Sequence, residues 1–205
     1  MTPRDTARAW LADPMGVVLD FETTGWTGYA VEVAVVDMTG AEVLSMRLWP
    51  GDGVPMDAGA LACHGIRLDD VKGLPTWADA WPCLRDALAG RLVVAYNATT
   101  ERGVLAREAL RCGSVLGERE VVCAMQLWRR HLGQPRAVPL PGGDHSALGD
   151  ARAALEVVRR VAGVPCRELA RATLACPFRC LDCDKVVGPT VTSHGERLPT
   201  RCGRD

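Results

Sequence analysis

The sequence predicts an α/β domain built on a mixed sheet of five strands. Three short runs rich in β-branched residues follow one another between residues 17 and 49, with only turns between them. Two further apolar runs, at 92–95 and 121–123, are each followed by a segment with helical spacing of its apolar residues. Strands joined by turns pair antiparallel and strands joined by helices pair parallel, so this order indicates both kinds of pairing.

Local signals place the elements along the chain. Thr2 before Pro3 is typical of a helix start, and Thr76 and Ser146 have the same capping role further on. Strands are expected at 17–22, 31–36, 43–49, 92–95 and 121–123. Helices are expected after Thr2, at 77–89, 99–111 and 125–132, and between Ser146 and Gly163. Loops rich in proline and glycine are expected at 50–55 and 133–145.

The composition is that of a soluble globular protein, with 48% hydrophobic and 24% charged residues in a chain of 205. This length accommodates one domain, expected at 1–163, and a small basic, cysteine-rich tail at 164–205. The net charge of −1 gives no sign of nucleic-acid binding through bulk positive charge.

The sequence contains no signal for export or membrane insertion. The first fifteen residues lack the apolar core of a signal peptide, and no apolar stretch approaches the ~20 residues of a membrane span. The nine cysteines are an odd number, which favours free or metal-bound thiols over disulfides. We therefore expect a cytoplasmic protein without a membrane partner.

Two carboxylates close the first strand. Asp20 and Glu22 follow the apolar run 17–19, and they share one face of the strand because they are two residues apart. Like charges at that separation repel unless a cation neutralises them or one takes up a proton. Oxygen ligands suit hard cations such as Mg²⁺ or Mn²⁺. The alternative is a strand that ends at solvent with two exposed acids.

Two later stretches hold further candidates. Glu101 follows Asn97 in the first turn of an expected helix, where the helix dipole alone also favours an acid. His145 ends the loop 133–145, and Asp150 lies one turn into the next helix. A histidine beside a metal-binding acid suits a general base. The alternative is a surface histidine and a solvated aspartate.

The combined pattern resembles the DEDDh family of 3′–5′ exonucleases, which includes polymerase proofreading subunits, RNase T and oligoribonucleases. The stretch 20–25, Asp-Phe-Glu-Thr-Thr-Gly, is similar to the first motif of the family, 96–101 to its second and 145–150 to its third. The sequence Cys-His-Gly-Ile at 63–66 resembles a His-Gly-Ile element common in the family. The resemblance covers about residues 5–162 and implies a ribonuclease-H-like fold.

The resemblance also implies a role for each matched residue. Asp20, Glu22 and Asp150 would be ligands of two Mg²⁺ or Mn²⁺ ions about 3.5–4 Å apart. Glu101 would take the place of the fourth acid, and His145 would deprotonate the attacking water. The product would be a nucleoside 5′-monophosphate. The residues expected to bind the terminal nucleotide are Thr23, Thr24, Gly25, Trp26, His64 and Asn97.

Three positions depart from the family pattern. The fourth acid is normally Asp, so Glu101 lengthens the arm by roughly 1.5 Å and is expected to bind the second ion more weakly. Thr100 stands where the family has Phe. Trp26 stands where the family often has an aliphatic residue. It could stack on a base or seal the core from a turn.

The tail carries a candidate zinc site of its own. Cys180 and Cys183 form a Cys-x₂-Cys pair of the kind found in zinc ribbons. Cys202 follows about twenty residues later, and the fourth ligand is either Cys176 or His194. A structural Zn²⁺ would explain how this segment could fold. The alternative is a disordered tail with incidental cysteines.

The leading hypothesis is a metal-dependent exonuclease that acts on the 3′ end of single-stranded DNA or RNA. Both nucleic acids stay open as substrates, because the choice between them rests on contacts to a 2′-hydroxyl. The alternative is a catalytically impaired module of this fold that binds nucleic acid or a partner, with its site weakened through Glu101. A polymerase or a second copy of the chain is a further candidate partner.

Overall fold

The computed structural model describes residues 1–113, 120–164, 178–179 and 186–187. Five strands form one sheet in the order β3-β2-β1-β4-β5. Its strands are β1 (Val17–Thr23), β2 (Ala30–Asp37), β3 (Glu42–Arg47), β4 (Val93–Ala95) and β5 (Val121–Cys123). β1, β2 and β3 pair antiparallel, whereas β4 pairs parallel with both β1 and β5. The predicted mixed five-stranded sheet is therefore confirmed.

Seven helices lie in the described residues. They are α1 (Pro3–Ala12), α2 (Ala58–His64), α3 (Leu68–Val71), α4 (Trp77–Leu88), α5 (Ala98–Arg111), α6 (Ala124–Leu132) and α7 (Ala147–Ala162). Thr2, Thr76 and Ser146 cap α1, α4 and α7 as predicted, each accepting a hydrogen bond from a backbone N–H of the first turn. No helix in these residues is both long and apolar enough to cross a bilayer.

No helix is predicted from the sequence at residues 56–72, where the structure has α2 and α3. Both are too short to show an apolar period. α2 does carry local signals at its two ends. Asp57 caps its N-terminus through Gly59 N and Ala60 N, and Gly65 ends it in the left-handed conformation.

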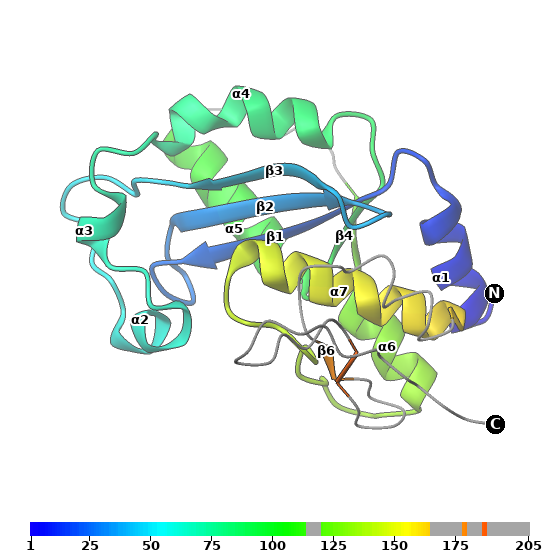
Figure 1. Ribbon diagram of the computed structural model, residues 1–205. Coiled ribbons are helices and arrows are strands. Elements are labelled where there is room, and N and C mark those ends of the chain that lie inside the picture. The colour runs from blue at the N-terminus through cyan, green and yellow to red at the C-terminus, as the bar shows by residue number, and fades with distance from the viewer. Residues whose placement is uncertain (114–119, 165–177, 180–185, 188–205) are drawn as a thin grey trace, which may run out of the picture.

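The helices cover both faces of the sheet (Figure 1). α4 and α5 pack on one face and share a buried apolar cluster with β1, β2 and β4. α1, α6 and α7 pack on the opposite face around a second buried cluster. The result is a three-layer α/β/α domain with β1 at the centre of its sheet.

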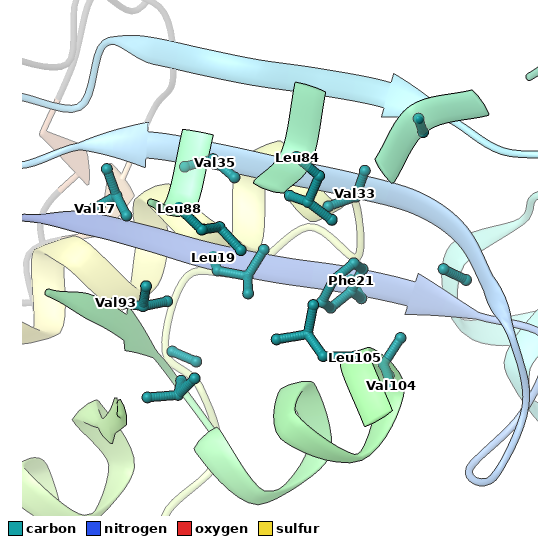
Figure 2. Packing of buried hydrophobic residues seen from close by; sticks show 14 of the residues in the cluster. Val17, Leu19, Phe21, Val33, Val35, Leu84, Leu88, Val93, Val104 and Leu105 are labelled. Carbon is teal, nitrogen blue, oxygen red and sulfur yellow. The ribbon is translucent and has the colours of Figure 1, made fainter. Parts of the chain in front are cut away.

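The alternation of β1 positions the acids. Val17, Leu19 and Phe21 point into the cluster formed with α4 and α5 (Figure 2). The Phe21 ring lies 6.1 Å from that of Trp77, centroid to centroid. Because successive side chains of a strand point to opposite faces, Asp20 and Glu22 are directed to the face covered by α7.

A short pair of strands, β6 (Phe178–Arg179) and β7 (Val186–Val187), forms a separate antiparallel ladder. The candidate zinc ligands of the tail all lie outside the described residues. They are Cys176, Cys180, Cys183, His194 and Cys202. The four cysteines that the structure does describe are free thiols.

Candidate active site

The three strongest candidates from the sequence come together at the end of β1. Asp20, Glu22 and Asp150 each offer a carboxylate oxygen, and these oxygens lie within 4.8 Å of one another. β1 supplies the first two, and the first turn of α7 supplies the third. Asp20 is only 8% exposed, which excludes the alternative of a strand end with two solvent-exposed acids.

The carboxylates of this cluster are buried close enough together to repel one another. Burial raises the pKa of Asp20 well above its usual range, and the charges of Glu101 and Asp150 raise it further. Burial, followed by the charge of Asp150, raises the pKa of Glu22 to about 8. A bound cation would remove this repulsion and restore the ionised carboxylates.

Glu101 completes the acidic environment from the other side of β1. It lies in the first turn of α5, is 5% exposed, and its Oε2 has no hydrogen-bond partner among the described residues. Burial raises the pKa of Glu101 to about 8. A helix-dipole role requires no burial, so the dipole alone does not account for this position. Glu101 lies outside the three-carboxylate group but close enough to raise the pKa of Asp20.

Asp150 is held by the loop that precedes α7. Its Oδ1 accepts hydrogen bonds from the backbone N of Asp144 at 3.0 Å and of His145 at 3.1 Å. Burial still raises the pKa of Asp150, although these bonds oppose the shift. Asp144 itself accepts from Ser146 N and Oγ, so the loop folds back on the helix start. A Cβ at Gly149 would overlap the Asp144 carboxylate, and this close approach requires glycine there.

His145 stands beside the acids on an exposed loop. Its backbone has φ 59°, which places this non-glycine residue in the left-handed region. The hydrogen bond from the His145 backbone N–H to Asp150 Oδ1 holds the main chain next to an acid of the cluster. The imidazole Nδ1 lies 3.2 Å from the Sγ of Cys63 in α2. The loop before α7 and the end of α2 are therefore neighbours (Figure 1).

A family model described as an exonuclease, of the RNase T type, matches residues 17–158. The chain belongs to this exonuclease family. The match spans all five strands of the main sheet and includes every residue of the acid cluster. The DEDDh assignment made from the three motifs is thereby confirmed, and the protein is a nuclease of the hydrolase class.

Two curated relatives agree with the family. Uncharacterized exonuclease CP81 of Escherichia phage 186 is 28% identical over 182 residues, which cover 76% of this chain and 92% of that protein. The putative bifunctional exonuclease/endonuclease protein MT2247 of Mycobacterium tuberculosis is 29% identical over 181 residues. That match covers 77% of this chain but only 27% of the relative, so the chain spans about a quarter of that protein.

Solved structures show the same fold. Exonuclease X in complex with 5′-overhanging duplex DNA is 27% identical with a TM-score of 0.51, covering 78% of this chain and 99% of the other. The nuclease domain of 3′hExo, a DEDDh family member bound to rAMP, has a TM-score of 0.57 at 12% identity, covering 75% of this chain and 94% of the other. A polymerase or homodimer partner gains no support from these comparisons.

The predicted nucleotide-binding turn of this exonuclease is internally braced. The Thr23 hydroxyl donates to Gly25 O at 2.8 Å. Thr24 is buried, and its hydroxyl accepts from Tyr29 N at 3.1 Å, so this group serves the turn itself. Trp26 is 81% exposed. That exposure contradicts the alternative in which Trp26 seals the core. It also leaves the indole ring available for stacking on a base.

His64 and Asn97 lie at the edges of this site. Ile66 N donates to His64 Nδ1 at 3.0 Å, so the neutral ring carries its hydrogen on Nε2, which donates to Thr23 O at 3.1 Å. His64 thus braces the turn from α2. Asn97 Nδ2 donates to the Thr100 hydroxyl at 2.8 Å. Thr100 therefore pairs with Asn97 at the position where the family has Phe.

One acid that helps to position the site, Glu32, is not among the residues predicted from the sequence. Glu32 of β2 lies opposite Glu22 in the antiparallel register. Its Oε2 accepts from Ala147 N at 2.8 Å and its Oε1 from Arg47 Nε at 3.1 Å. Glu32 therefore anchors the first residue of α7, the helix that carries Asp150. Its place in an alternating strand gave no sign of this role, because the contact spans 115 residues.

Proposed function

We propose that this protein is a divalent-metal-dependent 3′–5′ exonuclease that hydrolyses single-stranded nucleic acid to nucleoside 5′-monophosphates. The observation that carries the proposal is the convergence of Asp20, Glu22 and Asp150 within 4.8 Å in a chain of this exonuclease family. The raised pKa values of Glu22 and Glu101, both about 8, support a site that is completed by cations.

The donor set fits divalent ions. Every candidate ligand is a carboxylate oxygen, which suits Mg²⁺ or Mn²⁺. Asp20, Glu22 and Asp150 would hold the ions, and Glu101, whose Oε2 has no hydrogen-bond partner in the described part of the chain, would be a further ligand. Two such ions, when bound, supply positive charge that stabilises the attacking and leaving oxygens of the phosphodiester.

His145 would act as the general base. It would accept a proton from the attacking water at one imidazole nitrogen, because a neutral histidine is the common base near neutral pH. Its exposure gives water and substrate access. Its backbone N–H to Asp150 keeps it next to the acid cluster.

The nucleotide would bind along the turn at 23–26. The exposed Trp26 ring offers a stacking surface for a base, and such stacking tolerates any base. The substrate class is supported by two neighbours of the same fold, one solved with a 5′-overhanging DNA duplex and one with rAMP. A single strand is proposed because its unpaired bases are free to stack.

The test uses matched DNA and RNA strands labelled at either end, incubated with Mg²⁺ or Mn²⁺. We expect 5′-labelled strands to shorten progressively and 3′-labelled strands to release labelled mononucleotide from the start. A circular single strand serves as the control and should resist digestion. Full-rate digestion in excess EDTA, or release of mononucleotide first from the 5′ end, would overturn the proposal.

A second candidate is the catalytically impaired binding module, and the observation behind it is that Glu101 stands outside the three-carboxylate group. It predicts that strands are bound in the presence of Mn²⁺ but never shortened. The presence of Asp20, Glu22, His145 and Asp150 in one place favours the enzyme, because binding alone does not need that set.

A further inference from the structure

The His145 ring has one hydrogen-bonding neighbour in the described part of the chain. Its Nδ1 lies 3.2 Å from the Sγ of Cys63, a residue 82 positions earlier, in the last turn of α2. The backbone N–H of His145 fixes the main chain through Asp150, but rotation about the side-chain bonds is not fixed by that contact. The ring itself is exposed. Cys63 is therefore the described residue that can orient the imidazole through a hydrogen bond.

A histidine that removes a proton from water needs a free lone pair on the nitrogen that faces the water. If Nδ1 carries the ring hydrogen, Nε2 has that lone pair, and Nδ1–H needs an acceptor. A thiol sulfur can accept such a bond, although weakly. If the thiol instead donated to Nδ1, the ring hydrogen would sit on Nε2 and block it.

The placement of Cys63 is itself fixed by two contacts at the ends of α2. Asp57 N, just before the helix, donates to Thr24 O at 2.8 Å. His64 Nε2, at its last residue, donates to Thr23 O at 3.1 Å. α2 is thus anchored at both ends to the turn that follows β1, so Cys63 approaches His145 from a braced element.

We propose that Cys63 is a positioning residue for the hydrolytic reaction: its sulfur accepts the Nδ1–H of His145 and so leaves Nε2 free to take the proton of the attacking water. This inference rests on the proposed role of His145 as general base. The last turn of α2 would then support the site in two places. Cys63 contacts the proposed base, and the next residue, His64, contacts the nucleotide-binding turn.

The kinetic test compares Cys63→Ala and Cys63→Ser with Cys83→Ala, a matched change at an exposed cysteine of α4. We expect Cys63→Ala to lower kcat by about 10-fold, the lower end for loss of a group that orients a site histidine, and to leave KM unchanged. Cys63→Ser keeps an acceptor and should retain most of the kcat. Cys83→Ala should match the wild type.

A double-mutant cycle separates positioning from general stability. If Cys63 acts through His145, adding Cys63→Ala to His145→Ala should change kcat no further. An equal loss of kcat in both backgrounds would overturn the proposal, as would a wild-type kcat for Cys63→Ala.

The ring tautomer is measured directly, without turnover, by long-range ¹H–¹⁵N correlation spectra of the histidines. We expect His145 to carry its hydrogen on Nδ1 in the wild-type and Cys63→Ser proteins, and to shift toward the Nε2–H form in Cys63→Ala. An Nε2–H ring in the wild type would overturn the inference while the exonuclease proposal stands. Full activity of His145→Ala would instead remove the proposed general base, whatever the tautomer.

Discussion

The N-terminal turns of α5 and α7 present acids to the same strand, but they hold them differently. On α7, Ser146 caps the helix, Glu32 accepts from its first N–H, and Asp150 accepts two backbone hydrogen bonds. On α5, Asn97 makes no side-chain capping bond, and Glu101 is buried with Oε2 unpartnered among the described residues.

This difference predicts that protein hydrogen bonds position the acid on the α7 side, whereas a bound cation is needed to pair the acid on the α5 side. The α7 side is assembled by protein hydrogen bonds, so Asp150 is positioned whether or not a cation is bound. On the α5 side, the buried Glu101 carboxyl has an Oε2 that finds no hydrogen-bond partner among the described residues, and we expect a bound cation to supply one. Loss of a partner for a buried polar group costs free energy, so the Glu101 side should respond more strongly to metal.

The largest predicted effects come from changing the acid that lies between the two sides and the proposed base. Asp20→Asn and His145→Ala should each slow hydrolysis at least ~100-fold, the lower range for loss of a general base. Asp20 lies between the two helices and His145 lies in the loop before α7. Rates measured on an end-labelled single strand, with far-UV circular dichroism as the control for folding, check this. Near-wild-type turnover by either variant would contradict the assignment.

The next effect concerns Glu101. Glu101→Ala should slow hydrolysis on the order of 10-fold, as weakened metal binding commonly does, and should require more Mn²⁺ for half-maximal rate. Glu101→Asp should retain activity or increase it, because it restores the arm length usual in the family. Glu42→Gln, at an exposed acid of β3, is the matched control. If all four proteins gave superimposable rates against Mn²⁺, Glu101 would have no place in the site.

The smallest effect is on stability without metal. Glu22 and Glu101 have pKa values of about 8 in the folded protein, against 4.5 for the ordinary carboxyl. Between these values the folded protein binds more protons than the unfolded one, so stability falls as pH rises through this window. Melting temperatures of the metal-free protein should therefore fall between about pH 5 and about pH 8, and Mn²⁺ should raise them most at the upper end.

Glu101→Gln sharpens that measurement, because it removes one of the carboxyl groups whose pKa is raised in the folded protein. We expect its metal-free melting temperature to depend less on pH and its response to Mn²⁺ to be smaller. A melting temperature that rises steadily across the window in the wild type would show that these carboxyls are not held at raised pKa.

The sequence predicted the parts of this site that short patterns encode. Alternation placed Asp20 and Glu22 on one face of β1, and a capping residue placed Asp150 in the first turn of α7. Contacts between distant segments left no such pattern. The hydrogen bond between Glu32 and the first residue of α7 joins residues 115 positions apart. The contact between Cys63 and His145 joins residues 82 positions apart.

Burial was the other property that local patterns could not supply. The sequence allowed two interpretations of Glu101 and of Trp26. An acid in a first helical turn can be a metal ligand or only favour the helix dipole, and a tryptophan in a turn can stack on a base or seal the core. Their exposures of 5% and 81% favour the functional reading for each. Exposure depends on how α5 and the β1–β2 turn pack, which no single segment determines.

Calorimetric titration with Mn²⁺ is the most direct test of this difference between the α5 and α7 sides. It measures the number of bound ions and their affinities without turnover. We predict about two ions per wild-type chain, with the weaker one lost in Glu101→Ala and kept in Glu101→Asp. Loss of both ions is expected in Asp20→Asn. A single ion in the wild type, with the same affinity in Glu101→Ala, would contradict the division between an α7 side built by the protein and an α5 side completed by metal.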